Sequence, residues 1–444
     1  MIKFILNKII PFTALLFHFT PLFADNEIYD GQDVSGKHFG PSCIDSSWVA
    51  TTAIGTYFSQ ANLTNADFTD ANLTKAFFYR AILTGANFTN AIIDNANLNT
   101  TGVTNEQLYS TANYKRGDLS GVELGTNNWQ GCDFSGQNMT NASLSSAVLT
   151  GANFTNTIIK GVDFDRAGLT KEQLYSTASY KNKDLSGVGF DRNNLESCDF
   201  SSQNLTNARF TESSLTNANF TSADLRGAYL NVLETGEFIT KNTIMSDGVI
   251  KNFSMKSVSD RLVIREHVPA KYPEYGEYQI SAKISEADSE ISGGAQLSLE
   301  QGAKLEITNG KTLKLASDGK LLIQTDVNSS TTISIDPLAA LNIEKGGEVF
   351  VDIVGELNAN DYEALKLLEW DADSNVVGLS DLSKDETLFL TLNGEIYIGE
   401  WDYLIENNQF IITIGQVPEP AAYAAILGIF AIIFVYKKRK SFNG

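Results

Sequence analysis

The sequence is poor in the residues on which small stapled folds and most catalytic sites depend. Only 3 cysteines, 3 histidines and 8 prolines occur among 444 residues, and 33 Lys and Arg stand against 53 Asp and Glu, which gives a net charge of −20. So few cysteines exclude a disulfide-rich scaffold. The deficit of basic side chains argues against a general nucleic-acid binder, because clustered Lys and Arg are what neutralise phosphate groups.

Motifs for catalysis are missing as well. Neither HExxH nor GxSxG occurs, and no glycine-rich phosphate loop follows a predicted strand. Such motifs supply metal ligands, an activated serine or a phosphate cradle, so the sequence predicts no catalytic, cofactor-binding or metal site.

Both ends of the chain carry apolar segments with charged flanks. Residues 1–24 contain two lysines, a short apolar run and a small residue before an abrupt polar turn, which predicts a secretory signal peptide cleaved after Ala24. At the other end, a basic cluster follows the apolar segment 421–436, which predicts a single transmembrane helix with its C-terminus on the cytoplasmic side. The motif before this segment is Val417, Pro418, Glu419 and Pro420, and the basic tail after it is Lys437, Lys438, Arg439 and Lys440.

The order of motif, short span and basic tail over residues 417–444 resembles the PEP-CTERM sorting signal. The resemblance implies recognition and cleavage by an exosortase near Pro420, in a Gram-negative-type cell that makes extracellular polysaccharide. A plain stop-transfer anchor is the alternative interpretation. Removal of both terminal segments would leave 27 basic and 53 acidic residues, a net charge of −26.

A five-residue repeat fills much of the first half. A large apolar residue recurs at every fifth position over 63–108, 119–174 and 185–230, and a small residue, usually Ala, stands two positions before it. A period of five fits neither a helix nor a flat strand. A chain that turns a corner every five residues closes a square coil in twenty, with the large and small residues inside and Asn, Asp and Thr outside.

The pattern A(N/D)(L/F)xx resembles the pentapeptide repeat family, whose fold is a right-handed quadrilateral β-helix. The resemblance covers residues 58–230 and implies an all-β coil, in which the 32 apolar centres make eight turns at four centres per turn. Cys132 and Cys198 occupy the small inward position and are predicted to be buried packing thiols. The centres chosen as the repeat core are Leu63, Phe68, Leu73, Phe88, Phe134, Phe154, Phe200, Phe210, Phe220 and Leu225.

Two nearly identical segments, 104–114 and 170–180, interrupt the repeat. Each begins with a threonine followed three residues later by glutamine, the pattern of a capping box. We therefore expect two short helical insertions packed against the coil. Residues 25–57 keep the five-residue step imperfectly, as expected for a cap that covers the open edge of the first turn.

After residue 230 the composition changes. Residues 231–416 show short alternating apolar pairs, mostly eight residues apart and punctuated by glycine, which predicts a second β-rich module. A β-solenoid is the favoured arrangement, and hairpin turns at 309–310 and 318–319 would support an antiparallel meander instead. Residues 231–420 hold 14 basic and 32 acidic residues, whereas the coil 58–230 holds 12 and 16, so the acidity belongs mainly to the second module.

These features predict an exported, non-catalytic structural or interaction protein, anchored transiently in the inner membrane and then sorted to the cell surface or the extracellular polysaccharide matrix. The expected partners are an exosortase-type processing enzyme and a polysaccharide or surface protein, with no nucleic acid. One alternative is DNA mimicry, as in some pentapeptide repeat proteins, which the weak charge of the coil and the signal peptide disfavour. The other is a polysaccharide-active β-helix enzyme. The specific ligand and the oligomeric state do not follow from the sequence.

Overall fold

The computed structural model describes residues 32–33, 42–44, 47–49, 53–231, 238–266, 268–269, 279–308, 310–325, 331–336, 339–345, 347–353, 364–370, 375–377, 387–392, 395–396, 401–406 and 409–414. The predicted signal peptide, Ala24 and the whole segment 417–444 lie outside these residues. Within the described part, no helix combines the length and the apolar character needed to cross a membrane. The chain divides into two compact units, one containing Met1–Cys198, Ala208–Thr216 and Leu230–Gly236, the other the remaining residues.

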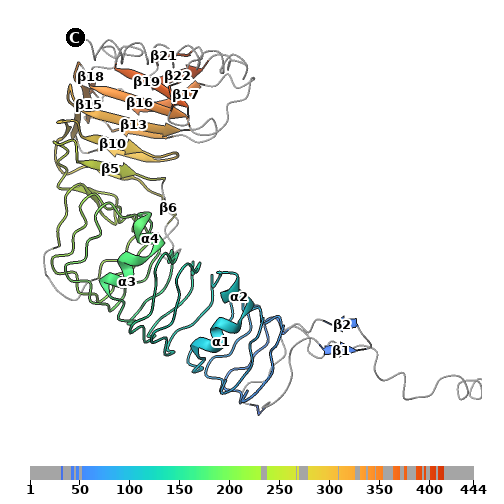
Figure 1. The fold of residues 1–444 in the computed structure, drawn as a ribbon. Helices are drawn as coiled ribbons and strands as arrows, with labels where there is room; N and C mark the ends of the chain where they lie inside the picture. The colour runs from blue at the N-terminus through green and yellow to red at the C-terminus, as the bar shows by residue number, and fades with distance from the viewer. Residues whose placement is uncertain are drawn as a thin grey trace, which may run out of the picture. The chain divides into compact units, whose positions relative to one another are not determined.

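The five-residue repeat forms a coil with a corner in every repeat (Figure 1). The residue before each apolar centre bridges in parallel to the residue one turn later, as Asn62 does to Ile82. The corner is a β-turn, closed for example by Ala66 N–H donating to the Leu63 carbonyl at 3.0 Å. Its third residue, here Asn65 with φ +57°, lies in the left-handed region, which Asn and Gly tolerate best.

The interior of the coil is filled by the repeat centres. Of the 32, all are buried except Leu230, which is half-buried. Rings stack from one turn to the next, with centroids 4.8 Å apart for Phe58 and Phe78 and 5.1 Å for Phe68 and Phe88. The ten core residues are each no more than 2% exposed, namely Leu63, Phe68, Leu73, Phe88, Phe134, Phe154, Phe200, Phe210, Phe220 and Leu225.

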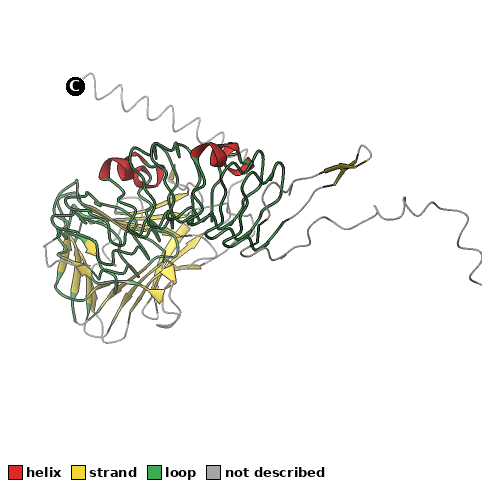
Figure 2. Ribbon diagram, turned by 90° about the horizontal axis from the view of Figure 1, so that it is seen from below, coloured by secondary structure: helices red, strands yellow, loops and turns green. Residues whose placement is uncertain are grey.

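Two pairs of short helices occur at the expected insertions, on one side of the coil (Figure 2). They are α1 (Asn105–Ser110) with α2 (Ala112–Lys115), and α3 (Lys171–Ser176) with α4 (Ala178–Lys181). Both capping boxes form, one at Thr104 with Gln107 and the other at Thr170 with Gln173. Because of the extra residues, Asn97 pairs with Glu123, 26 positions later, instead of 20.

The region before the coil is described in part. Strands β1 (Ser42–Ile44) and β2 (Ser47–Val49) form an antiparallel pair. Asp33 bridges to Asn62, and Asn62 N–H donates to the Gln32 carbonyl at 2.8 Å. Residues 32–33 thus add a rung beside the first turn of the coil.

The second module consists mainly of three parallel sheets. The first contains β5 (Arg261–Ile264), β10 (Gln296–Leu299), β13 (Lys320–Thr325), β16 (Glu348–Ile353), β19 (Leu388–Leu392) and the antiparallel β20 (Glu395–Ile396). The second contains β8 (Ala282–Ile284), β11 (Lys304–Ile307), β14 (Thr332–Ile335) and β17 (Ala364–Trp370), with β22 (Gln409–Ile414) and β21 (Trp401–Glu406) antiparallel at its end. The third contains β9 (Ser289–Ile291), β12 (Thr312–Leu315), β15 (Ala340–Ile343) and β18 (Asn375–Val377). Short pairs are β3 (Thr243–Ile244) with β4 (Ile250–Lys251), and β6 (Val268–Pro269) with β7 (Gln279–Ile280).

This arrangement is a β-solenoid, because successive strands belong to different sheets and each pairs in parallel with a strand one turn later. Strand β10 pairs with β13 while β11 and β12 lie between them in the chain, and β11 pairs with β14 in the same way. The hairpin interpretation is therefore wrong. Gly319 is a corner between two sheets, where a Cβ would lie 2.2 Å from the Ile291 carbonyl oxygen, so the turn signal marks a corner of the winding.

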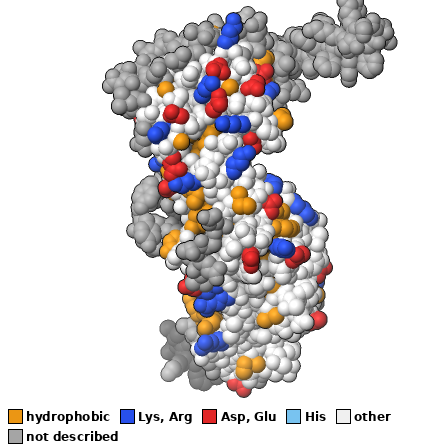
Figure 3. Space-filling view, turned by 90° about the vertical axis from the view of Figure 1, so that its left-hand side faces the viewer, with side chains coloured by type: hydrophobic (Ala, Val, Ile, Leu, Met, Phe, Trp, Pro, Cys, Tyr) orange, Lys and Arg blue, Asp and Glu red, His pale blue; other side chains and the backbone are white. Residues whose placement is uncertain are grey.

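Charged side chains form ladders across the strands of this solenoid. Lys314 on β12 lies 2.9 Å from Glu290 on β9 and 2.8 Å from Glu344, which follows β15. The two glutamates raise the pKa of Lys314 above its usual range. Lys320 and Glu348 form a similar pair at 2.7 Å. Figure 3 shows basic and acidic side chains interspersed on one face of this solenoid.

Candidate interaction surface

Many of the outward Asn and Asp side chains of the coil, those that precede a repeat centre, are bonded within their own repeat. The Asn62 side-chain oxygen accepts hydrogen bonds from the Thr64 backbone N–H at 3.1 Å and from its hydroxyl at 2.7 Å. Asp67 accepts the same two bonds from Thr69. These local bonds stabilise each corner. The Asn/Thr-rich faces therefore offer a ligand fewer free groups than the sequence suggests.

The helix pairs are fastened to the coil by polar groups. The Gln107 amide donates to the carbonyls of Leu83 and Ala86, both at 2.8 Å. The Tyr109 hydroxyl accepts a bond from the Asp133 N–H at 2.7 Å, and the Tyr114 hydroxyl donates to the Asp133 carbonyl at 2.7 Å. Both tyrosines thus help to pack the expected helical insertion against the coil.

Both cysteines of the coil are buried thiols. Cys132 is 0% exposed and Cys198 2% exposed. Burial raises the pKa of Cys132 to about 12 and that of Cys198 to about 11. A thiol that stays protonated at neutral pH is a poor nucleophile. Within the described residues, no group of three or more His, Cys, Asp or Glu side chains could hold a metal ion.

One face of the coil departs from the Asn/Thr pattern. Its first turns present Tyr57 and then Phe77, with ring centroids 6.0 Å apart, whereas the equivalent positions of a neighbouring face hold Asn62 and then the aliphatic Ile82. Tyr79 lies beside Phe77 at 6.3 Å, and the Arg80 guanidinium lies 5.1 Å from the Tyr79 ring centroid. Tyr57 is 44% exposed. Three aromatic rings and a cation are thus grouped at the surface.

The next rungs of the same face carry two amides and a carboxylate. The amides of Asn97 and Asn99 both donate to Glu123 Oε2, the latter at 2.7 Å. The Asn97 oxygen accepts the Asn99 N–H at 3.0 Å, and the Asn99 oxygen accepts the Gly125 N–H at 2.6 Å. Each amide is therefore fixed in orientation. We call Tyr57, Phe77, Tyr79, Asn97, Asn99 and Glu123 the aromatic–amide face.

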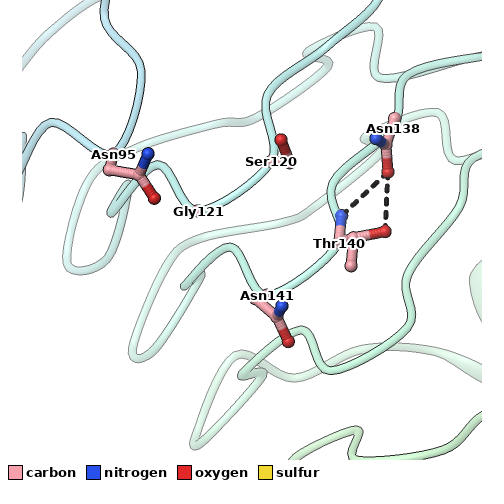
Figure 4. A pocket seen from close by; sticks show the side chains of 6 residues that line it. All are labelled: Asn95, Ser120, Gly121, Asn138, Thr140 and Asn141. Atoms are coloured by element: carbon pink, nitrogen blue, oxygen red, sulfur yellow. Dashed lines mark hydrogen bonds between the residues drawn. The ribbon is translucent and has the colours of Figure 1, made fainter. Parts of the chain in front are cut away.

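A shallow depression of about 330 Å³ adjoins this face (Figure 4). It follows a corner column in which Asn95 and Gly121 occupy equivalent left-handed positions of successive turns. A Cβ on Gly121 would lie 2.2 Å from Asn95 Oδ1, so glycine makes room for the amide. The lining is entirely polar or glycine and consists of Asn95, Ser120, Gly121, Asn138, Thr140 and Asn141.

Further along the same face the side chains form ion pairs. Arg209 contacts Asp191 at 2.7 Å and Asp163 at 2.8 Å. It reaches Asp163 by crossing Gly189, where a Cβ would lie 2.4 Å from the guanidinium. The charges of Arg209, Asp163 and Asp191 are therefore paired with one another at this end of the face.

Within the second unit, a buried ion pair joins the last pentapeptide turn to the β-solenoid. Arg226 and Asp224 are both 0% exposed and lie 2.7 Å apart. The guanidinium also donates to the carbonyls of Ile280 at 3.2 Å and Arg265 at 2.9 Å. The polar groups of this junction are therefore matched despite full burial.

The site residues predicted from the sequence fall into two groups, one that the structure describes and one that lies outside the described residues. The repeat core lies inside the coil. The processing and sorting residues lie outside the described residues, namely Ala24, Val417, Pro418, Glu419, Pro420, Lys437, Lys438, Arg439 and Lys440. The aromatic–amide face and the corner column were missed. Writing the sequence of each turn beneath that of the turn before would have revealed both, because residues that stack on one another in successive turns are then aligned.

Comparisons with known proteins agree with the repeat. A family model described as pentapeptide repeats matches residues 61–99, 118–169 and 194–231, in 8 copies. These segments are pentapeptide repeats. The comparison with curated proteins found no match.

Solved structures of pentapeptide repeat proteins resemble the chain at low identity. HetL, a pentapeptide repeat protein involved in heterocyst differentiation regulation in the cyanobacterium Nostoc, is 17% identical, and the match covers 51% of this chain and 93% of HetL with a TM-score of 0.18. Full-length QnrB1, a plasmid-mediated fluoroquinolone resistance protein, is 16% identical, with 47% of this chain and 87% of QnrB1 covered and a TM-score of 0.18.

Proposed function

We propose that this chain, whose residues 61–99, 118–169 and 194–231 are pentapeptide repeats, is an exported, non-catalytic interaction protein of the cell surface or the extracellular polysaccharide matrix. The observation that carries the proposal is the organisation of the coil surface. Asn and Asp side chains that precede a repeat centre are bonded within their own repeat, as Asn62 and Asp67 are, and the aromatic–amide face adds a group of aromatic rings next to fixed amides and a carboxylate. Such a surface suits display and contact.

The terminal segments supply the argument for export. Residues 1–24 have the pattern of a signal peptide that ends at Ala24, and residues 417–444 have the motif, apolar span and basic tail of a sorting signal. An exosortase-type enzyme would release the protein from a transient inner-membrane anchor at 421–436. The coil itself, with 16 acidic and 12 basic residues over 58–230, is a poor mimic of the phosphate charge of DNA.

Fractionation of the native cell tests the proposal. We expect the protein in the surface or extracellular fraction of cells that have the processing enzyme, and in the membrane fraction of cells that lack it. Immunoblots against residues of the coil would follow the protein in both strains. A protein found only in the cytoplasm of both strains would contradict the proposal.

A further inference from the structure

We infer that the aromatic–amide face and the adjoining depression bind a neutral, hydroxyl-rich oligosaccharide that lies along the axis of the coil. The inference rests on the proposed function, to which it adds a site and a ligand class. All of the residues involved, from Tyr57 to Asn141, belong to the first unit.

The aromatic part of the face fits the apolar side of a sugar ring. Tyr57 and Phe77 follow one another on successive turns with centroids 6.0 Å apart, and Tyr79 extends the group sideways. Aromatic rings provide large contact areas at small entropic cost, and a tyrosine adds a polar edge. Pyranose rings present C–H groups on one side and hydroxyls around the rim, which matches rings next to polar side chains.

The amide and carboxylate part fits the hydroxyl groups. Asn97 and Asn99 hold Glu123 through Oε2, and the bond from Gly125 fixes the second amide. Glu123 Oε1 is left to accept a bond from a ligand hydroxyl. Asn95, two residues before Asn97, places another amide at the edge of the depression (Figure 4). Fixed polar groups of this kind orient a ligand and give specificity.

Spacing and charge favour a glycan chain over other polymers. Successive turns of the coil stack at about 4.8 Å, the spacing of neighbouring strands, which is close to the length of one sugar ring. The face carries only Glu123, with Arg80 beside it, so it has little net charge with which to hold an acidic polymer. A peptide that added a strand to this face would need unpaired backbone groups on the coil. The backbone N–H groups of Phe77, Phe78 and Leu98 instead donate hydrogen bonds to neighbouring turns.

Calorimetric titration of the full chain with cellohexaose, mannohexaose and hexagalacturonic acid tests the inference. We expect one of the two neutral hexasaccharides to bind. Tyr79→Ala should weaken that binding about tenfold, which is about 1.4 kcal/mol, and Glu123→Gln by a similar factor. The matched control is Tyr229→Ala, since Tyr229 is a 51% exposed tyrosine on another turn of the coil, and it should leave affinity within about twofold.

The possible outcomes separate the inference from the proposed function. Unchanged binding in both variants, with unaltered circular dichroism and unfolding midpoints, would overturn the inference. So would binding of hexagalacturonic acid alone, or of none of the three sugars. If the protein is found at the cell surface and no sugar binds, the proposed function stands and this site assignment falls. If a sugar binds but the protein never leaves the cytoplasm, the site assignment stands and the proposed function falls.

Discussion

At the scale of single residues, the coil depends on where a side chain is absent as much as on where one is present. The backbone of Gly189 does not lie in the left-handed region, so its conformation alone does not require glycine. The lack of a Cβ is what lets the Arg209 guanidinium pass over it to Asp163. No sequence pattern marks this glycine, because the two partners stand 46 positions apart. Such contacts follow from the stacking of turns.

Gly189→Ala should therefore weaken the ion pair between Arg209 and Asp163. Because the methyl group would lie 2.4 Å from the guanidinium and 2.7 Å from the carboxylate, Arg209 has to move aside. The pair is partly exposed, so we expect a loss of about 1 kcal/mol in the free energy of unfolding. Urea unfolding measures it. In the Arg209→Ala background the same substitution should cost much less, and equal costs in both backgrounds would contradict the explanation.

Alkaline pH should destabilise the coil through its buried thiols. Burial raises the pKa of Cys132 from 9.0 to about 12 and that of Cys198 to about 11. The unfolded chain then releases these protons first, so the folded state is fully favoured below about pH 9 and loses this advantage as pH rises toward 11 and 12. The free energy of unfolding should therefore fall between about pH 9 and pH 12.

The matched control for this effect is the double variant Cys132→Ala, Cys198→Ala. Alanine fits both places, because Ala66 occupies the equivalent buried position of an earlier repeat. Urea unfolding of the double variant should show a smaller fall over the same pH range. An identical fall in both proteins would assign the pH dependence to other groups.

At the scale of elements, the repeat and its interruptions were predictable, and the way in which the helices attach was not. The period of five determines the coil because it places every centre inside, and the capping boxes determine α1 and α3 because their bonds are local. The second role of Gln107, which donates to Leu83 and Ala86 in the preceding turn, depends on tertiary structure. The choice between solenoid and meander likewise needed the partner of each strand, which stands beyond two other strands along the chain.

Gln107→Glu separates the two roles of this residue. Glutamate preserves a capping box in general, but here a carboxylate would face two carbonyl oxygens that now accept bonds at 2.8 Å. We expect a loss of about 2 kcal/mol in the free energy of unfolding at neutral pH. Glu106→Gln, on the exposed side of the same helix, is the control and should change stability little. A neutral effect of Gln107→Glu would mean that the helix is not held by this amide.

At the scale of the whole molecule, the second unit holds a turn of pentapeptide coil and the β-solenoid together. The connection uses Arg226 and Asp224, both fully buried, with the carbonyls of Ile280 and Arg265 as further acceptors. Nothing in the sequence pattern marked this pair, since both residues stand at positions that face solvent elsewhere in the coil. Their burial arises only because the next module packs over them.

Arg226→Met should therefore be far more costly than the loss of a surface charge. It would leave the Asp224 carboxylate buried without its partner, which costs about 3 kcal/mol or more. We expect limited proteolysis to cut the variant between residues 230 and 280 faster than the parent chain. The double variant with Asp224→Leu should recover much of the stability, and a double variant as unstable as Arg226→Met alone would show that the carboxylate is not the cause.

The measurement that tests the central claim most directly is the intact mass of the protein recovered from the surface or extracellular fraction of its own cell. We predict a chain that begins after Ala24 and ends near Pro420, without the tail Lys437 to Lys440. A chain from that fraction that still carries the tail Lys437 to Lys440 would contradict the account.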